Sequence, residues 1–348
     1  MQAKKHCLRP GQILSIGFLM VAIIGALLLM LPISTTEGNA VDFVDALFTS
    51  TSAVCVTGLI VVNTGEAFTL FGQIVILLLI QIGGLGFMTM ASLFFMAIGK
   101  RFSLKERLVI QESFNSDTLQ GLIRLVRNAV VIALSVETVG AIVLSFAFVP
   151  DFGWGKGIFS GIFISVSAFC NAGFDPLGMT NSLEAYISDP LVNIPIMLLI
   201  VTGGLGFAVL MDILHLRHRQ HKLMLHTRLV LRITACLIVI GALLIMVTEW
   251  SNPKTLDREG MSVPEKVMAS FFQSITSRTA GFDTIYQGGL TPAGKFVTTM
   301  LMFVGASPAG TGGGIKTTTF FMVLLAVWSI VHNRRDYNVG RRRLGEQI

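Results

Sequence analysis

The sequence predicts an all-α polytopic membrane protein built from repeated units of helix, re-entrant loop and helix. Hydrophobic residues make up 53% of its 348 residues and charged residues only 13%, which is too little charge to cover a soluble domain. No charged residue occurs between Arg9 and Glu37 or between Glu66 and Lys100, and either interval can hold the roughly 20 residues that cross a bilayer. Three similar glycine runs recur along the chain, which indicates an internal repeat.

Six long apolar segments are expected, at 11–33, 67–99, 128–149, 190–214, 229–250 and 294–331. Basic residues precede the first segment, so a signal peptide is the competing interpretation of the N-terminus. That apolar run is too long for a signal-peptide core and lacks a convincing cleavage site. We therefore expect it to be retained as a membrane span.

A shorter, half-apolar stretch lies between the first and second apolar segments, another between the third and fourth, and another between the fifth and sixth. These stretches read VDFVDALFTSTSAV, GKGIFSGIFISVSAF and PEKVMASFFQSITS, and each predicts a helix that enters the membrane and returns. They lead into the glycine runs TSAVCVTGL, SAFCNAGF and TSRTAGF, whose glycines at 58, 173 and 281 are 115 and 108 residues apart. A second motif also recurs in each repeat. It reads QIGGLGF at 81–87 and VTGGLGF at 201–207, and its third counterpart is GASPAGTGGGIK at 305–316.

The chain is thus expected to divide into three repeats joined by basic linkers. The repeats cover 11–99, 128–216 and 229–331, the linkers cover 100–127 and 217–228, and a basic tail covers 332–348. Because Lys and Arg concentrate on the cytoplasmic side, we expect the N-terminus, linkers and tail in the cytoplasm and the re-entrant loops to enter from outside. A basic tail is also found in nucleic-acid-binding proteins, but beside membrane spans it favours anionic lipid, so no nucleic-acid partner is expected.

The tips of the re-entrant loops carry no carboxylate, histidine or other group for acid–base chemistry. Glycine permits backbone conformations that turn nearby carbonyl groups toward a common axis. Rings of such carbonyls can replace the hydration shell of a bare cation. A single Thr-Gly would more often be a glycine-capped turn, but three copies at matching places favour an ion filter.

These motifs resemble the Trk/Ktr/HKT superfamily of potassium transporters, most closely the Ktr-type membrane subunit. The resemblance covers residues 10–335 and includes LMLPIS at 29–34, DALFTSTSAVCVTGL at 45–59 and LIQIGGLGFMT at 79–89. It implies a fold like that of a potassium channel with fused subunits, and a transporter, not an enzyme. By this resemblance the backbone carbonyls of three triads form the selectivity filter, and K⁺, the substrate, is the only metal ion that they hold. The triads are Val56, Thr57 and Gly58; Asn171, Ala172 and Gly173; and Thr279, Ala280 and Gly281.

The family has four repeats, whereas three of the usual four are visible in this sequence. No fourth glycine loop follows the third repeat, and the family's fourth-repeat arginine beneath the filter has no counterpart. A three-sided pore would leave polar backbone facing lipid. We therefore expect that the sequence is truncated, the alternative being that the last quarter comes from elsewhere.

The glycine-rich interruption of the sixth segment, at 305–314, should break a helix in mid-membrane. The resemblance implies a movable gate loop beneath the filter, comprising Gly305, Ser307, Gly310, Thr311, Gly312, Gly313, Gly314 and the following Lys316. A nucleotide-binding P-loop is the rival interpretation. It fails because Ile315 separates the last glycine from Lys316, and because the run follows an apolar helix in place of a strand.

Three carboxylates need separate interpretation. Asp175 and Asp283 each stand two residues after a filter glycine, where they either concentrate cations at an external mouth or cap the next turn. Glu137 lies within the third apolar segment, where a charge is costly, so it is either functional or paired with a neighbouring helix.

The predicted function is potassium uptake across the bacterial inner membrane, driven by the membrane potential, with no cofactor bound by this chain. The alternatives are an alternating-access cation symporter, which would need broken helices in inverted halves, and an intramembrane enzyme, for which no convergent polar set exists. The resemblance further implies a homodimer, a cytoplasmic ring of nucleotide-binding regulatory subunits (KtrA- or TrkA-like), and sodium as an activator in some members. The residues themselves do not distinguish K⁺ from Na⁺ selectivity.

Overall fold

The computed structural model describes residues 10–36, 41–86, 89–90, 92, 96, 122–178, 182–216, 223–258, 260–332, 337–339 and 342–344. The first group of helices contains α1 (Pro10–Leu29), α2 (Phe43–Cys55), α3 (Thr64–Ala67) and α4 (Leu70–Leu85). The second contains α7 (Leu122–Phe169), a 3₁₀ turn (Glu184–Tyr186), α8 (Pro190–Leu205) and α9 (Phe207–His215). The third contains α10 (Leu225–Glu249), α11 (Val263–Thr276), a 3₁₀ turn (Gln287–Gly289), α12 (Pro292–Phe303) and α13 (Thr317–Val331).

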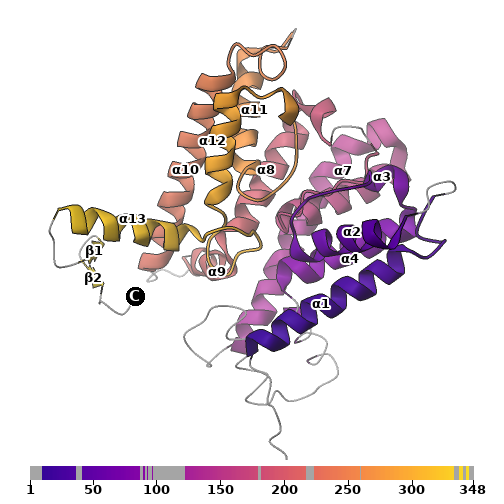
Figure 1. Ribbon diagram of the computed structural model, residues 1–348, viewed down its shortest axis with the longest axis horizontal. Helices are drawn as coiled ribbons and strands as arrows, with labels where there is room; N and C mark the ends of the chain where they lie inside the picture. The colour runs from indigo at the N-terminus through magenta and orange to yellow at the C-terminus, as the bar shows by residue number, and fades with distance from the viewer. Residues whose placement is uncertain are drawn as a thin grey trace, which may run out of the picture.

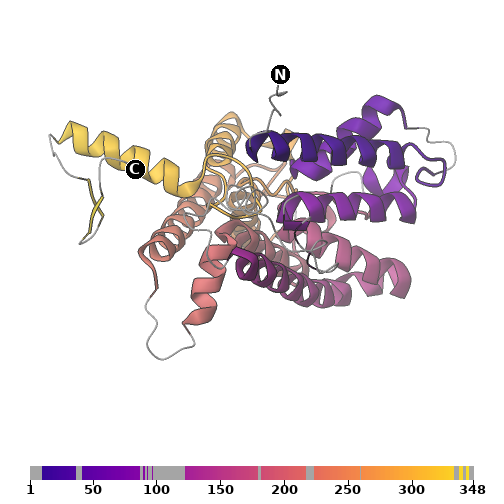
Figure 2. The same ribbon diagram turned by 90° about the horizontal axis from the view of Figure 1, so that it is seen from below.

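The groups lie side by side in chain order, with α7 and α8 between α1–α4 and α10–α12 (Figure 1). α13 projects away from the bundle in two perpendicular views (Figures 1 and 2). These helices confirm the predicted all-α class. One feature that the sequence did not predict is a small antiparallel hairpin in the basic tail, formed by β1 (Tyr337–Val339) and β2 (Arg342–Leu344).

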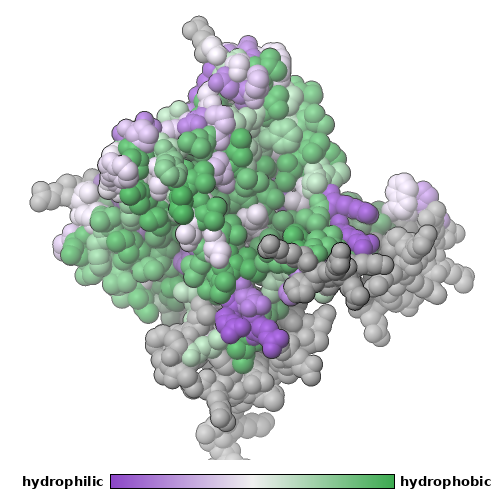
Figure 3. Space-filling model, turned by 180° about the vertical axis from the view of Figure 1, so that it is seen from behind, coloured by the Kyte–Doolittle hydropathy of each residue, from purple (hydrophilic) through white to green (hydrophobic). Residues whose placement is uncertain are grey.

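Among the described residues, three helical stretches are long and apolar enough to cross a membrane: Gly11–Leu29, Ile123–Phe169 and Leu225–Glu249. The pair α8 and α9 makes a fourth if it is counted as one bent span. Large apolar side chains lie exposed along these helices, and they cover the middle of the molecular face in Figure 3. A surface of this kind is suited to lipid, where hydrocarbon replaces water as the solvent of the side chains.

The fourth apolar segment differs from the continuous run expected at 190–214. It breaks at Gly206, where α8 and α9 meet at a bend of 99°. Gly206 adopts φ 90° and ψ 144°, and Gly86 after α4 is nearly the same at φ 85° and ψ 135°. Only glycine adopts this backbone readily. The repeated GGLG motif therefore marks the end of a helix, although the sequence on both sides of it is apolar.

The segment expected at 128–149 and the stretch 155–169 are two limbs of α7, which folds back on itself. The turn is at Gly153, with φ 76° and ψ 170°, three residues after Pro150. The second limb returns closely along the first, since a Cβ on Gly161 would lie 2.5 Å from Ser145 Oγ. Small residues allow this approach, as is usual for helices packed in a membrane.

The same three-residue contact holds each re-entrant helix in its repeat. A serine of the re-entrant helix lies against a glycine of the opening helix and a leucine of the closing helix. The three sets are Ser50, Gly25 and Leu79; Ser165, Gly140 and Leu199; and Ser274, Gly241 and Leu301. Each serine hydroxyl also donates to a carbonyl of the opening helix: Ser50 to Ala22 (2.7 Å), Ser165 to Glu137 (2.7 Å) and Ser274 to Ile238 (2.9 Å).

We expect Gly140→Val to destabilise the protein. The new Cβ would lie 2.5 Å from Ser165 Oγ and 2.8 Å from a Leu199 methyl group. Overpacking of this kind costs about 1–3 kcal/mol, so the thermal unfolding midpoint of the detergent-solubilised protein should fall by several degrees. Gly155→Ala is the matched control, because a Cβ there meets nothing within 4 Å. An equal fall in both variants would contradict the role of the contact.

Candidate functional site

The three re-entrant helices deliver loops with one repeated backbone conformation. Val56, Asn171 and Thr279 have φ values of 55°, 58° and 67°. Two residues later, Gly58, Gly173 and Gly281 have φ values of 75°, 68° and 83°. A left-handed conformation at a non-glycine residue costs about 1–3 kcal/mol, most for a β-branched one, and persists where the surroundings impose it.

The three glycines converge on one another, although they lie in different repeats. A Cβ on Gly58 would lie 2.9 Å from the Ala172 carbonyl oxygen, and one on Gly173 would lie 2.6 Å from that of Ala280. A Cβ on Gly281 would lie 3.3 Å from Gly173 Cα and 3.6 Å from Gly58 Cα. The approach therefore requires glycine, and the three triads predicted from the sequence meet at one place.

The loop carbonyls are left free while the rest of each loop is held. Ser52 Oγ donates to the Leu59 carbonyl (2.7 Å), and Thr276 Oγ1 to the Phe282 carbonyl (2.6 Å). In the second repeat, Ser167 Oγ accepts from the Phe174 amide (2.9 Å). Within the described part of the chain, none of the nine triad carbonyls accepts a hydrogen bond from another residue. Bare carbonyl oxygens at a common centre can coordinate a dehydrated cation.

The helix ends that surround this centre also favour a cation. α2, α7 and α11 all end within three residues of a triad. None of these helices has a basic residue in its last turn. The C-terminal end of a helix carries a partial negative charge, so each of these ends contributes negative potential at the loops, which at the third loop acts against the buried cation Arg278.

A cavity of about 550 Å³ opens above the three glycines, and four acidic residues line it: Glu66, Asp175, Glu184 and Asp283. Burial and the neighbouring charge of Glu184 raise the pKa of Asp283 to about 6. Burial also raises the pKa of Asp175. The cavity is therefore a vestibule with an acidic wall.

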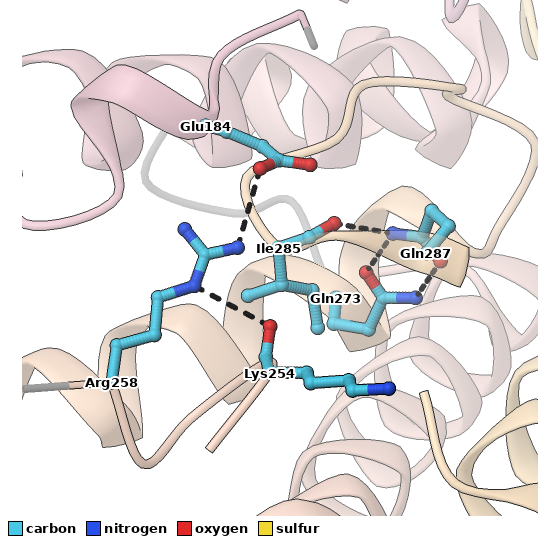
Figure 4. Close-up of polar contacts among 6 residues, drawn as sticks. All are labelled: Glu184, Lys254, Arg258, Gln273, Ile285 and Gln287. Atoms are coloured by element: carbon cyan, nitrogen blue, oxygen red, sulfur yellow. Dashed lines mark hydrogen bonds and ion pairs between the residues drawn. The ribbon is translucent and has the colours of Figure 1, made fainter. Parts of the chain in front are cut away.

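Polar contacts fix the wall of this vestibule (Figure 4). Glu184 pairs with Arg258 at 3.2 Å, which joins the second repeat to the third. Gln273 of α11 and Gln287 exchange two amide hydrogen bonds of 2.9 Å, and Gln287 also donates to the Ile285 carbonyl (3.3 Å). These bonds hold the loop that carries Asp283 against the re-entrant helix of its own repeat.

Residues 304–316 form a non-helical loop between α12 and α13 that contacts two of the glycine loops. Asn171 Nδ2 donates to Thr311 Oγ1 (2.9 Å), and Thr311 Oγ1 donates to the Phe169 carbonyl (2.8 Å). The Gly313 amide donates to Thr279 Oγ1 (3.1 Å). Side chains of two triads therefore hold this loop next to the site.

The loop also completes the broken end of α8. The amides of Ser307 and Thr311 donate to the carbonyls of Gly204 (2.9 Å) and Gly203 (3.2 Å), and the Phe207 amide donates to the Ala309 carbonyl (3.0 Å). Further bonds inside the loop join Ser307 to Thr317 (3.0 Å) and Lys316 to the Gly312 carbonyl (2.9 Å). The predicted gate-loop residues other than Gly314 thus each make at least one hydrogen bond that holds the loop.

Sequence reasoning missed three structural features of the site. It did not find the serine–glycine contacts, although the serines at 50 and 165 stand eight residues before the first and second triad glycines and the serine at 274 stands seven before the third. It missed Glu249, whose buried carboxylate accepts four hydrogen bonds from three residues, including the amide of Thr291 at the start of α12. It also missed Arg278, a buried cation beside the third triad.

Comparisons with known proteins find matches that cover most of the chain. A family model described as a cation transport protein, TrkH, matches residues 9–348. The chain is 45% identical over 336 residues to the Ktr system potassium uptake protein B of Bacillus subtilis, a match that covers 96% of this chain and 74% of that protein. It is 42% identical to the potassium/sodium uptake protein NtpJ of Enterococcus hirae, over 91% of this chain and 69% of that protein.

The structure of the potassium transporter TrkH from Vibrio parahaemolyticus superposes with a TM-score of 0.73 at 18% identity. The match covers 99% of this chain and 69% of that one. At this level of identity it shows a shared fold.

We expect Thr311→Val to loosen the loop at 304–316. The substitution keeps the shape but leaves the buried Asn171 amide without its acceptor, which typically costs about 1–3 kcal/mol. Hydrogen exchange at the amides of Gly310 and Thr311 should accelerate by roughly tenfold. Thr299→Val is the control, since Thr299 bonds only within its own exposed helix turn. Unchanged protection at both amides would contradict a holding role for Thr311.

Proposed function

This chain belongs to the TrkH family of cation transport proteins, and we propose that it takes up potassium ions across the plasma membrane through the three glycine loops. The family consists of transporters, not enzymes. The observation that carries the proposal is the set of nine carbonyls, free of hydrogen bonds from described residues, around three converging glycines. An ion entering from the vestibule would exchange its hydration shell for these oxygens.

The acidic vestibule and the loop at 304–316 have complementary roles in this mechanism. The vestibule raises the local cation concentration above the filter through the charges on its wall. The loop at 304–316 serves as the gate, because it contacts Asn171 and Thr279 and interrupts what would otherwise be a continuous span. Transport then requires the loop to leave its bonds to the filter side chains.

Partners and coupling ions belong to the same proposal. Relatives named as proteins of Ktr potassium uptake systems support a membrane subunit that works with a separate regulatory partner, which we propose is a ring of nucleotide-binding subunits on the basic, cytoplasmic side. We further propose a homodimer. The relative named as a potassium/sodium uptake protein supports sodium as an activator or second substrate.

Expression in a bacterium that lacks its own potassium uptake systems tests the function directly. We expect growth at low external potassium and accumulation of ⁸⁶Rb⁺, a potassium tracer. Growth only at high potassium, in cells whose membranes contain the folded protein, would refute potassium uptake.

Gly173→Ala should abolish this uptake. The new methyl group combines a left-handed φ of 68° with a distance of 2.6 Å to the Ala280 carbonyl oxygen, so the second and third loops must separate. Gly178→Ala separates strain from close approach, because φ is 73° there but the nearest atom is 3.5 Å away. We expect ⁸⁶Rb⁺ uptake to be lost in the first variant and largely kept in the second. Equal uptake by the two variants would show that the meeting of the glycines is not required.

Uptake should decline as the external pH falls through about 6. The pKa of Asp283 is raised to about 6, so its carboxylate is charged above that pH and neutral below it. Loss of one vestibule charge should lower the initial rate at subsaturating potassium by roughly threefold to tenfold. Asp283→Asn should be slow at pH 7.5 and lose this part of the pH dependence, whereas Asp257→Asn, outside the vestibule, should keep the parent profile. A parent-like profile in Asp283→Asn would contradict the role of this charge.

A further inference from the structure

Arg278 is a buried cation that no part of the proposed transport mechanism uses. It immediately precedes the third triad and is only 7% exposed. Its guanidinium donates from Nη2 to the carbonyl of Gly305 (3.3 Å), at the start of the loop 304–316, and its Nε has no partner among the described residues. No carboxylate among the described residues pairs with it. Burial of a cation with so little compensation is unfavourable, so its retention needs an explanation.

The surroundings of Arg278 explain how the charge is tolerated. The side chain borders a cavity of about 10 Å³ between α8, α11 and the loop, lined also by Gly204, Ile275 and Ala306. Nearby are the C-terminal ends of α8, at Leu205, and of α12, at Phe303. Helix C-termini carry partial negative charge, which stabilises a nearby guanidinium. The stabilisation therefore depends on the helix ends and the loop remaining together.

Comparison of the three repeats shows that this position is special in the third. The residue before the triad is Cys55 in the first repeat, Cys170 in the second and Arg278 in the third. Cys170 fills the space against Gly84, in the closing helix of the preceding repeat. Arg278 instead lines, together with Gly204, the small cavity beside α8, and its guanidinium reaches the Gly305 carbonyl. The long cationic side chain thus occurs in the repeat whose closing helix is interrupted by the loop.

We propose that Arg278 is a positioning residue that holds the N-terminal end of the loop 304–316, at Gly305, in the closed state. This inference rests on the proposed gating role of that loop. Asn171 and Thr279 hold the middle of the loop, whereas Arg278 holds its first residue and joins it to the third filter triad. Opening would withdraw the Gly305 carbonyl and leave the guanidinium without a partner, so Arg278 favours the closed loop.

The test uses Arg278→Met and Arg278→Lys in the full protein, each combined with Ser307→Cys. Ser307 is fully buried in the loop, so the rate at which a water-soluble thiol reagent modifies this cysteine reports opening. The rate is measured above that of the protein's own thiols, beside ⁸⁶Rb⁺ uptake into proteoliposomes. Methionine keeps much of the volume without the charge, and replacement of a buried cation by an apolar residue is often tolerated.

We expect Arg278→Met to raise both the modification rate and the basal uptake by about tenfold, since charge-assisted hydrogen bonds contribute this much or more to an equilibrium. Arg278→Lys, which keeps a cation, should fall between Arg278→Met and the parent. Lys266→Met is the control, because Lys266 is a similarly buried cation, in the α11 helix that precedes Arg278, and it pairs with Asp257 and lies over Trp250. That control should modify at the parent rate.

An unchanged modification rate in Arg278→Met, or an equal rise in Lys266→Met, would overturn the proposal. If Arg278→Met does not fold, Arg278→Lys decides, with a parent-like rate overturning the proposal and a raised rate supporting it. Absence of ⁸⁶Rb⁺ uptake by the parent, together with a faster rate in Arg278→Met, would refute potassium transport while supporting the hold on the loop.

Discussion

The structure depends on a constraint on backbone carbonyls. Non-helical backbone within a membrane must be buried in protein or face a water-filled path, because hydrocarbon offers no hydrogen bonds. The nine triad carbonyls accept no hydrogen bond from the described residues, and hydroxyl groups of the re-entrant helices secure the rest of each loop, as Ser52 and Thr276 do. Those helices are secured in turn by serine and glycine against the opening helices, as at Ser165 and Gly140. The free carbonyls thus require the whole repeat behind them.

The third repeat differs from the other two in its loop 304–316, and the end of α8 in the second repeat binds that loop. Because α8 stops at Leu205, its last carbonyls have no partner within the helix. The loop 304–316 supplies amides to two of them, at Gly203 and Gly204, and a Cβ at Gly206 would collide with the Pro308 carbonyl. The break in one repeat and the loop in the next therefore stabilise each other. Movement of the loop must expose carbonyls at the end of α8.

The sequence predicted the repeats, the converging glycines and the interruption of the sixth segment, since each depends on residue type at a fixed spacing. It did not predict the bend at Gly206, because the run on both sides is apolar and hydropathy does not register direction. Nor did it predict that Asn171 would bond Thr311, 140 residues away in the chain. Contacts of this range follow from how repeats pack together, which a periodic pattern within one repeat does not contain.

Glu137 is a residue that differs from its counterparts in the other two repeats and joins two repeats to each other. At its position the first and third repeats have Ala22 and Ile238, and in all three the backbone carbonyl accepts from a serine. The Glu137 carboxylate accepts from Gln81 of α4 through both oxygens, at 3.2 and 3.1 Å, and is absent from the vestibule lining. Of the two roles that the sequence left open, these contacts support pairing with a neighbouring helix. Since Gln81 belongs to the first repeat and Glu137 to the second, the pair fixes the relative position of two of the glycine loops without the carboxylate lying at the point where they meet.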